Sequence, residues 1–329
     1  MCSKYSLCLI VPYFGQFPSF FKFFLNSCIN NPSIDWLFVT DNTLPINASN
    51  IHVLKMTFAE FRDKLRNKFN FPIALNQPYK LCDLRPAYGY IFEEEINGYD
   101  FWGHCDVDLI FGNIRKYLDN KIFSKYHKIL TWGHLSIYKN NHDVNRWFMT
   151  LPPVEPKYSF DKVFQYPDNL AFDEFGGKES WGGIVKMIRN SGIPIYDEMN
   201  FDDIRQTQWS FLSLRLIKDK PYTLKELSKM SSYYSYNNGI LLRHIMTPEG
   251  EDVSESLYVH FQKRNMSVAE GVGCNSYIIA PNVFLPSSSD INDVWKRSSY
   301  RYIYLPYIRR RFNNLIRKIR KAMKGEKYV

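Results

Sequence analysis

The chain has 329 residues, which is enough for one large domain or two ordinary ones with a buried core. Hydrophobic residues make up 45% and charged residues 23%, a balance that excludes disordered, collagen-like and disulfide-scaffold proteins. The net charge of +9 is concentrated at 296–329, which holds 12 lysines and arginines and one glutamate; the remainder, with 30 basic and 32 acidic residues, is nearly neutral, which argues against a nucleic-acid-binding body.

Cysteine spacing and the N-terminus indicate the compartment. The six cysteines are scattered, and none forms the C-x-x-C pair of a zinc or redox site. Scattered cysteines in a chain of this length are typical of reduced thiols in the cytosol. The apolar run at 5–12 is too short for a secretory signal, and no stretch reaches the ~20 apolar residues of a membrane helix. We therefore expect a cytoplasmic protein.

Strands and helices alternate along the first part of the chain. Apolar runs and helical spacing predict strands at 6–11, 36–40, 51–56 and 99–111, and helices at 19–28, 57–69 and 81–95. This alternation predicts an α/β fold with a mixed, mainly parallel sheet flanked by helices. Because ligands bind at the carboxyl ends of such strands, the loops after Val11, after Thr40 and around Asp106 should lie on one rim.

The rest of the chain is less regular. Residues 139–238 predict an elaboration of the same domain that supplies substrate loops, and 256–261 predicts one more strand. The run Pro286-Ser-Ser-Ser289 is typical of a linker before the basic tail. We therefore expect one domain at 1–285, and a linker and tail at 286–329.

The run Asp106-Val107-Asp108 carries the strongest chemical signal. Two carboxylates one residue apart on an extended segment share a face, and a turn there lets both approach one hard cation such as Mg²⁺ or Mn²⁺. A D-x-D pair alone often only caps a turn. Here it stands between apolar and aromatic segments, where two charges are costly unless they bind something.

Two segments resemble a known family. The run Phe101–Gly112 looks like the D-x-D segment of a GT-A glycosyltransferase, and Pro78–Gly89 resembles the helix that precedes that segment. With the opening Val11–Gly15 and the pair Thr40-Asp41, they are similar to a group of bacterial capsule and O-antigen transferases, an uncharacterised GT-A-like family. The resemblance covers roughly the first half of the chain.

This resemblance implies a GT-A-like catalytic domain at 1–285, with a nucleotide-sugar-binding half at 1–120 and an acceptor-binding half at 121–285. The loop after the first strand and Asp41 would hold the base and ribose, and the 80–85 segment would line the nucleotide site. For Asp83, an ordinary ion pair in a helical turn is an equal alternative. The implied nucleotide-sugar residues are Pro12, Tyr13, Phe14, Gly15, Asp41, Lys80, Asp83, Arg85, Asp106, Lys263 and Arg264.

The resemblance also implies a metal, because many GT-A enzymes complete the metal shell with a histidine near the end of the catalytic domain. His260 is the best candidate, since it closes an apolar strand and precedes Lys263 and Arg264, whose charges could offset a diphosphate. A histidine satisfied at a strand end is the alternative, and His104 is a second candidate. The implied cofactor is Mn²⁺ or Mg²⁺, held by Asp106, Asp108 and His260.

An inverting transferase needs a carboxylate that deprotonates the acceptor hydroxyl. Asp173 and Glu174, in the aromatic and glycine-rich run 169–177, are the predicted catalytic pair, with a solvated loop acid as the alternative. The run 132–134, Trp-Gly-His, could border the sugar pocket, although core packing is the commoner role for such a tryptophan. Retaining chemistry stays open.

The tail predicts an amphipathic helix with cations around an apolar stripe. The apolar positions are Ile308, Phe312, Leu315, Ile316, Ile319 and Met323. Such a helix favours an anionic membrane surface, at about 1 kcal/mol per cation near the lipid; a helix packed on its own domain is the alternative. We expect residues 300–329 to attach the protein to the inner face of the cell membrane, and we expect no nucleic acid partner.

Together these features predict a metal-dependent glycosyltransferase of the hexosyltransferase type in bacterial surface polysaccharide synthesis. Its donor would be a nucleotide sugar, with a UDP-sugar favoured, and its acceptor lipid-linked or an oligosaccharide. Alternatives are a non-catalytic glycan-binding or membrane-scaffold protein and a metal-dependent nucleotidyltransferase or phosphohydrolase. A nucleotidyltransferase should carry a glycine-rich loop near the first strand, where only Gly15 lies, and an aspartyl-phosphate hydrolase should carry its D-x-D there.

Overall fold

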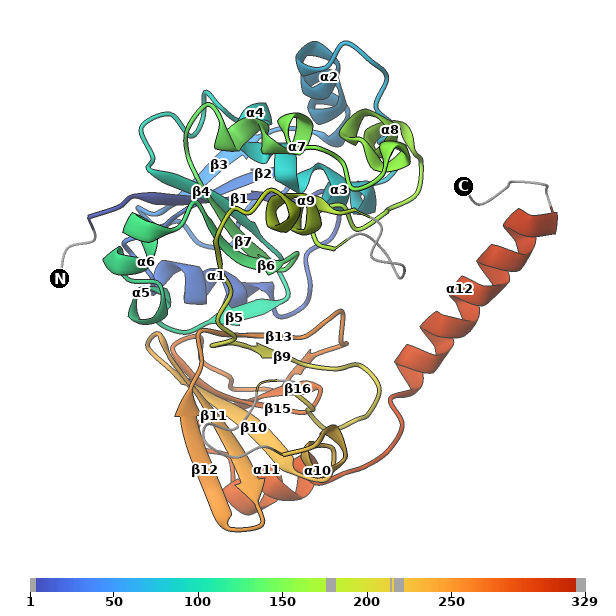
Figure 1. The fold of residues 1–329 in the computed structure, drawn as a ribbon. Helices are drawn as coiled ribbons and strands as arrows, with labels where there is room; N and C mark the ends of the chain where they lie inside the picture. The colour runs from blue at the N-terminus through green and yellow to red at the C-terminus, as the bar shows by residue number, and fades with distance from the viewer. Residues whose placement is uncertain (1–3, 176–181, 214, 216–221, 324–329) are drawn as a thin grey trace. The chain divides into compact units, whose positions relative to one another are not determined.

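A computed structural model describes residues 4–175, 182–213, 215 and 222–323 (Figure 1). The chain forms two compact units, unit 1 at 1–199 and unit 2 at 200–329. Residues 176–177 of the predicted catalytic run and 324–329 of the predicted tail lie outside the described residues. The observed division differs from the predicted single domain at 1–285, because the chain beyond residue 200 builds a sheet of its own.

Unit 1 is built on a seven-stranded mixed sheet in the order β3-β2-β1-β4-β7-β6-β8. Its strands are β1 (Leu7–Pro12), β2 (Asp35–Thr40), β3 (Ile51–Lys55), β4 (Phe101–Cys105), β6 (Lys128–Trp132), β7 (Leu135–Lys139) and β8 (Ile195–Tyr196). β3, β2, β1 and β4 run parallel, β7 runs antiparallel to β4 and to β6, and β8 runs parallel to β6. The predicted α/β fold class with a mainly parallel sheet is confirmed.

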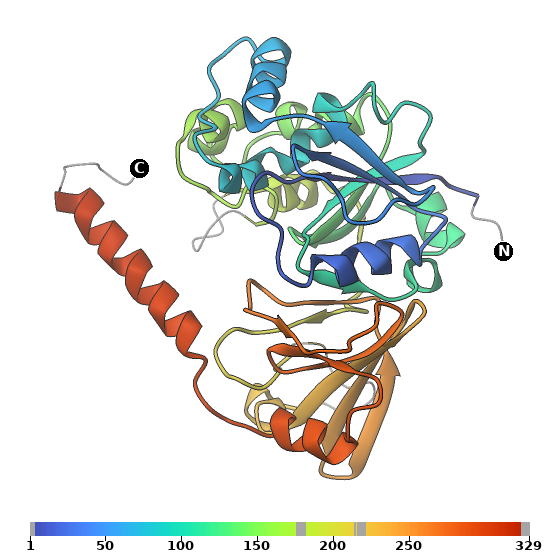
Figure 2. The same ribbon diagram turned by 180° about the vertical axis from the view of Figure 1, so that it is seen from behind.

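Helices cover both faces of this sheet, because alternate side chains of its buried strands point to opposite sides. Figures 1 and 2 show α1 along one face and α2, α4 and α7 along the other. On the α1 face, Phe24 packs edge-on against Phe38 of β2. On the other face, Trp102 of β4 and Tyr138 of β7 stack within a hydrophobic core. The helices are α1 (Phe21–Ile29), α2 (Phe58–Lys68), α4 (Tyr88–Ile91), α5 (Ile114–Tyr117), α6 (Asn120–Lys125), α7 (Trp147–Thr150), α8 (Phe160–Gln165) and α9 (Ile184–Asn190).

The predicted helix at 81–95 is broken into short turns. A 3₁₀ turn at Pro78–Lys80 leads into α3 (Leu81–Leu84), and a second 3₁₀ turn at Arg85–Ala87 leads into α4. Pro86 has no backbone N–H and its ring crowds the preceding turn, so a continuous helix cannot pass through it. The break lets neighbouring side chains of this segment point in different directions and so reach different partners.

The predicted strand at 99–111 becomes two strands with a turn between them, and the 132–134 run lies at the turn of a hairpin. The 99–111 segment forms β4 and β5 (Leu109–Phe111), with Asp106 and Asp108 in the turn between them. The 131–138 segment belongs to the β6–β7 hairpin, whose turn holds Gly133 and His134. Candidate site residues therefore stand in turns at strand ends.

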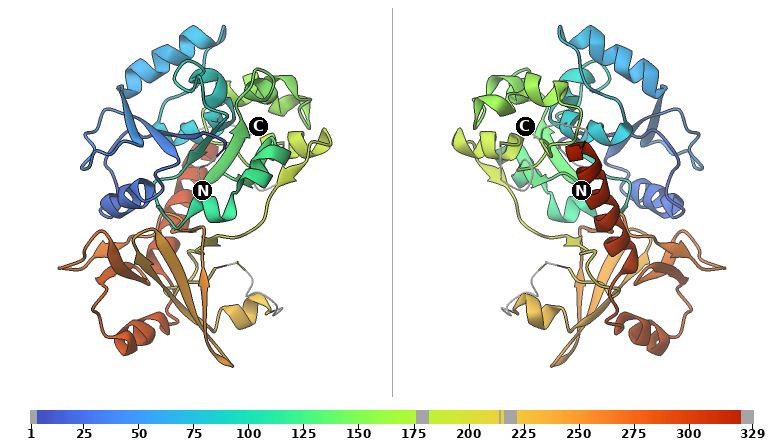
Figure 3. Two further views of the ribbon diagram at one scale, coloured as in Figure 1. Left: turned by 90° about the vertical axis from the view of Figure 1, so that its left-hand side faces the viewer. Right: turned by 90° about the vertical axis from the view of Figure 1, so that its right-hand side faces the viewer.

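Unit 2 contains a mostly antiparallel sheet in the order β12-β11-β10-β15-β16-β14. Its strands are β10 (Ser231–Asn237), β11 (Ile240–Thr247), β12 (Gly250–Glu255), β14 (Ser267–Val268), β15 (Ser276–Ala280) and β16 (Val283–Pro286). Helices α10 (Leu224–Leu227) and α11 (Ile291–Ser298) lie on opposite sides of this sheet (Figure 3). A short parallel pair, β9 (Asp202–Asp203) and β13 (Tyr258–His260), completes the unit's strands among the described residues.

The predicted linker at 286–289 is instead a short connection between β16 and α11 within unit 2. Asp290 caps the start of α11 by accepting a hydrogen bond from the Asn292 amide at 2.7 Å. Val294 is buried and packs with Tyr233. The serine-rich run was therefore a misleading signal, because it is followed by a well-capped helix with one apolar face.

Helix α12 (Leu305–Met323) occupies the predicted tail. Its start is fixed within unit 2: the Tyr304 hydroxyl accepts a hydrogen bond from the Asn265 amide at 2.9 Å, and Arg310 donates to Gln206 at 2.7 Å. Among the described residues, none of the helices combines the length and the apolar character that crossing a bilayer requires.

Candidate functional site

The loops that follow β1 and β2 are tied together in unit 1. The Tyr13 amide donates to the Val39 carbonyl at 2.9 Å, and the Asn42 side chain donates to the Gly15 carbonyl at 2.9 Å. Gly15 has a φ of +114°, a backbone conformation that residues other than glycine rarely adopt. Asp41 is exposed beside this contact, at the carboxyl end of β2.

The D-x-D turn lies next to the first of these loops. Burial and the negative charge of Asp108 raise the pKa of the Tyr13 phenol. The carboxylate oxygens of Asp106 and Asp108 lie within 4.8 Å of each other. The Asp106 amide donates to the His134 carbonyl at 3.0 Å, so the turn is also joined to the β6–β7 hairpin. The three predicted loops thus meet at one end of the sheet.

Arg85 connects the D-x-D turn to the predicted catalytic pair. One guanidinium nitrogen, Nη2, binds the Asp106 carboxylate, and the other, Nη1, donates to Asp173 Oδ2 at 2.8 Å. Nη1 also donates to the Gly133 carbonyl at 2.8 Å. A single cation therefore joins acidic groups from two distant segments and the hairpin turn.

The carboxylates of Asp173 and Glu174, called the acidic pair below, both lie at the hairpin turn. Glu174 accepts a hydrogen bond from the Gly133 amide at 2.7 Å. A Cβ added at Gly133 would stand 2.8 Å from Asp173 Oδ2 and 2.8 Å from Glu174 Oε1. Because both carboxylates converge on that position, only glycine leaves room for them at this turn.

Asp173 is buried, and the pKa of its carboxyl is raised to about 8, because burial and the repulsion from Glu174 outweigh the attraction of Arg85. A carboxyl whose pKa lies near neutrality can accept and release a proton under ordinary conditions, which is the property required of a general base or acid. Asp173 therefore has both the position and the proton affinity of an acid–base group.

Lys80 and Asp83 do not line a nucleotide site, contrary to the prediction. Both side chains are fully buried, and they pair with each other at 2.6 Å. The ordinary ion pair that was the alternative for Asp83 is the one observed. Phe14 is also a correction, because it is buried in the core against Phe58 and Phe61 rather than facing a ligand.

Arg264 in unit 2 is a structural residue rather than a partner for a diphosphate. Its guanidinium is buried and donates to the carbonyls of Gln208 at 2.7 Å and Trp209 at 3.0 Å and to the Asn282 side chain at 2.9 Å. Burial lowers the pKa of this group to about 10. Lys263, in contrast, is exposed.

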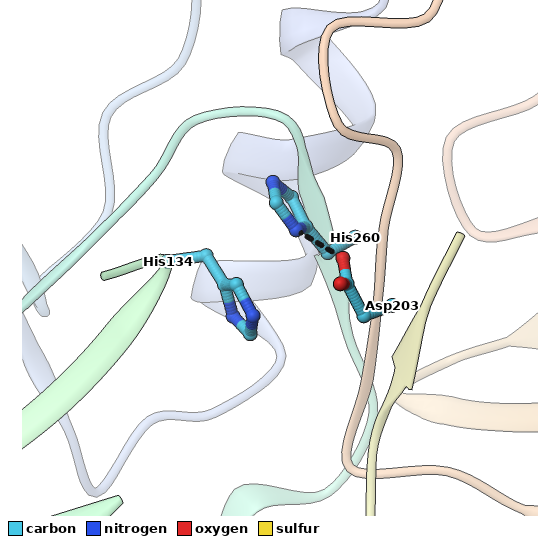
Figure 4. A group of neighbouring side chains, drawn as sticks. All are labelled: His134, Asp203 and His260. Atoms are coloured by element: carbon cyan, nitrogen blue, oxygen red, sulfur yellow. Dashed lines mark hydrogen bonds and ion pairs between the residues drawn. The ribbon is translucent and has the colours of Figure 1, made fainter. Parts of the chain in front are cut away.

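His260 is oriented by a carboxylate within unit 2. Its Nδ1 forms a hydrogen bond with Asp203 Oδ1 at 2.7 Å, drawn as a dashed line in Figure 4. The same figure draws His134, which belongs to the hairpin turn of unit 1. A carboxylate on one ring nitrogen is the usual second partner of a histidine that binds a metal through the other nitrogen.

The chemistry of the D-x-D turn fits Mn²⁺ or Mg²⁺. Both cations prefer carboxylate oxygens, and the two carboxylates of this turn lie close together and are partly exposed. His104, the second histidine candidate, is fully buried; burial and the neighbouring Arg85 lower its pKa well below the ordinary value. It packs as a neutral ring beside Tyr88.

Lys128 is a buried cation that was not among the predicted site residues. Its ammonium group is fully buried, binds the Leu130 carbonyl and stands 4.1 Å from the ring centroid of Tyr138. Leu130 has a positive φ of 60°, and the β6–β7 register shifts there. A lysine within the apolar run Lys128-Ile-Leu-Thr-Trp132 was the available signal, because a buried cation needs a specific partner.

Comparison with known proteins identifies one family model, described as a family of unknown function (DUF6625), which matches residues 9–288. Curated proteins give no match. Among solved structures, an active-site mutant of LgtC aligns with a TM-score of 0.35 and 10% identity over 60% of this chain and 74% of that chain. Mouse xyloside xylosyltransferase 1, in its apo form, aligns with a TM-score of 0.33 and 10% identity over 61% of this chain and 87% of that chain. Scores this low do not by themselves assign a fold or an activity.

Proposed function

Because the chain belongs to the DUF6625 family, whose function is unknown, we propose a function from its own residues: transfer of a sugar from a nucleotide-sugar donor to an acceptor hydroxyl. The single observation that carries this proposal is Arg85, which binds both Asp106 of the D-x-D turn and Asp173 of the acidic pair. Donor-activating and acceptor-activating carboxylates must lie on either side of one reaction centre, and this contact brings the two kinds together.

Donor binding is proposed for the end of the sheet where the loops after β1 and β2 meet the D-x-D turn. Tyr13, Gly15 and Asp41 would contact the nucleotide, and Asp106 and Asp108 would hold Mn²⁺ or Mg²⁺. Such an ion, when bound, neutralises the negative charge that develops on the leaving diphosphate. A UDP-sugar is the favoured donor.

Acceptor activation is proposed for Asp173. Its raised pKa suits proton abstraction from a sugar hydroxyl, and Arg85 fixes the orientation of its carboxylate. Glu174 is held on the Gly133 amide and would shape the pocket rather than accept the proton. An inverting reaction needs one such base, and an oligosaccharide or a lipid-linked sugar is the proposed acceptor, in bacterial surface polysaccharide synthesis.

The test is a panel of nucleotide sugars, with and without Mn²⁺, scored by thermal stabilisation and by release of the nucleoside diphosphate. Asp106→Ala and Asp108→Ala should each abolish the metal-dependent effects, because each removes a carboxylate ligand. Asp63→Ala is the matched control, since Asp63 is an exposed acid paired with Arg66 at 2.7 Å, away from the site. Undiminished stabilisation and turnover in both site variants would remove these residues from the reaction.

We also propose that α12 attaches the protein to the inner face of the cell membrane as a peripheral protein. Five apolar side chains of this helix are exposed: Leu305, Ile308, Phe312, Leu315 and Ile319. Arg309, Arg310 and Arg311 stand among them in the sequence. An apolar face left in water beside cations is the surface that an anionic bilayer binds, and a lipid-linked acceptor would be presented there.

A further inference from the structure

The Lys80–Asp83 pair is unusual because both charges are fully buried. Moving two charges out of water is costly, and a buried pair of this kind is often no more stabilising than apolar residues of the same size. The pair is acceptable only where the remaining hydrogen-bonding capacity of both groups is used. The partners of Lys80 and Asp83 therefore indicate what the pair is for.

All of those remaining bonds go to one stretch of backbone. Lys80 Nζ donates to the carbonyls of Val163 at 2.8 Å and Asp168 at 2.9 Å. The Asp83 carboxylate accepts from the amides of Leu170 and Phe172, both at 2.9 Å. The pair thus holds the 163–172 segment at four backbone positions.

This stretch has little regular structure of its own. Residues 166–171 follow the end of α8 without forming a helix or a strand, and Ala171 has a positive φ of 53°. Backbone of this kind keeps one conformation only when its N–H and C=O groups are bound by other parts of the protein. The next residue after the fourth contact is Asp173.

The same short segment also holds the Asp173 side chain. Arg85, two residues after Asp83, binds the Asp173 carboxylate. The 80–85 segment therefore fixes the backbone before Asp173 through one pair of charges and its carboxylate through a third. The break at Pro86 ends the helix here and allows these side chains to diverge.

We infer that Lys80 and Asp83 are positioning residues for Asp173: they fix the backbone at 168–172 so that the Asp173 carboxylate meets Arg85 and the Gly133 turn. This inference rests on the proposed role of Asp173 as the base. Neither Lys80 nor Asp83 contacts a substrate in this assignment.

The first test is hydrogen exchange of the whole protein, which needs no substrate. In Asp83→Asn and Lys80→Met, the amides at 168–173 should exchange about tenfold faster, because their buried partner is lost or loosened, while amides of β1 and β4 stay unchanged. Lys64→Met is the matched control, since it breaks a mostly buried pair with Glu95 at 2.6 Å elsewhere in unit 1. Exchange at 168–173 within about twofold of the unmodified protein in both variants would overturn the inference.

The second test follows Asp173 itself by carbon-13 NMR, with Asp173→Asn to identify its signal. In Lys80→Met the titration midpoint of Asp173 should move toward the ordinary aspartate value by about one pH unit, because a displaced carboxylate is better hydrated. It should not move in Lys64→Met. An unchanged midpoint alongside faster exchange would show that the pair only packs the loop, and would overturn the inference.

Two further arrangements keep the tests decisive. If a single variant does not fold, the double variant Lys80→Met/Asp83→Asn takes the place of that single variant in both experiments. The double variant removes both charges, so neither is left buried without its partner. For any nucleotide sugar that the protein turns over, Lys80→Met should lower kcat at least about tenfold with little change in donor KM. If the exchange and titration effects are absent, the positioning role is refuted. If both effects are present but the protein turns over no donor, only the proposed function is refuted.

Discussion

Gly133 takes part in the site through both of its backbone polar groups. Its carbonyl accepts from Arg85, and its amide donates to Glu174. A methyl group there would meet the carboxylates of the buried Asp173 and the half-buried Glu174 at 2.8 Å, and Arg85 holds the Asp173 carboxylate in place. At the scale of the residue, position 133 requires glycine because the two neighbouring carboxylates leave no room for a Cβ.

We predict that Gly133→Ala displaces Asp173 and Glu174 and lowers the free energy of unfolding by about 1–3 kcal/mol, as other overpacked sites do. Chemical denaturation measures the stability, and release of the nucleoside diphosphate measures the loss of turnover. Gly273→Ala is the control, since its added Cβ would meet nothing closer than 3.9 Å. Equal stability of the two variants would contradict the geometry given for the turn.

We predict that turnover rises with pH and levels off above about pH 8, because burial raises the pKa of Asp173 and the base must be deprotonated. Stability has the opposite sign. An aspartate whose pKa is raised on folding contributes stability below its unfolded pKa of about 3.9, and that contribution is lost as pH rises through about 8. A pH–kcat profile and urea unfolding at several pH values test both, and Asp173→Asn should remove the rising limb.

Residue types in the sequence indicate candidate groups such as Asp106 and Asp173, but they do not indicate which residues those groups contact. Asp106 and Asp173 stand out because acids in aromatic, glycine-rich turns are hard to explain by packing. That Arg85 binds both could not be predicted, because the contact joins residues 88 positions apart. Lys80 and Asp83 were misassigned because a charged residue in sequence gives no sign of being fully buried.

At the scale of the element, periodicity predicted the strands and helices of the parallel half, since apolar alternation and the Thr57 cap act locally. Thr57 accepts from the Glu60 amide, and Glu60 accepts from the Thr57 amide, a complete capping box. The break at Pro86 was missed, although a proline without a backbone N–H marks it in the sequence. A turn at the D-x-D run was considered, but the separate strand β5 that follows it was not predicted.

Helix α12 gives the prediction that belongs to this scale. Phe312→Ser with Leu315→Ser should reduce binding to vesicles of phosphatidylglycerol about tenfold or more, because it removes two exposed apolar side chains, and should leave the melting temperature unchanged. Cosedimentation measures the binding. Val53→Ser is the control, an exposed apolar residue on β3. Equal cosedimentation of all three proteins would exclude a membrane role for the helix.

At the scale of the whole molecule, the charge is divided very unevenly along the chain. Residues 296–329 hold 12 cations and one acid, whereas the rest is nearly neutral. The boundary between the two units at residue 200 does not follow the charge. It depends on pairing between strands that are far apart in the sequence, such as β10 and β15. Composition therefore revealed the basic tail, while the second unit could not be predicted from local patterns.

This charge distribution predicts a strong salt dependence. Binding to phosphatidylglycerol vesicles should weaken progressively as ionic strength rises from about 0.05 to 0.5 M, because screening shortens the reach of the tail's cations. Binding to neutral phosphatidylcholine should be weak at every salt concentration. Vesicle cosedimentation across that range is the measurement, and salt-independent binding would mean that apolar contact alone holds the protein.

The tight space at the tip of the β6–β7 hairpin also offers a means of sorting natural variants. A homologue with any larger residue at the position of Gly133 could not retain both carboxylates in their present places. Such a protein should lack one acid or carry a rebuilt turn, and so should differ in chemistry even where its D-x-D run is intact. The residue aligned with Gly133 would then distinguish homologues that retain both acids from homologues that have lost one of them.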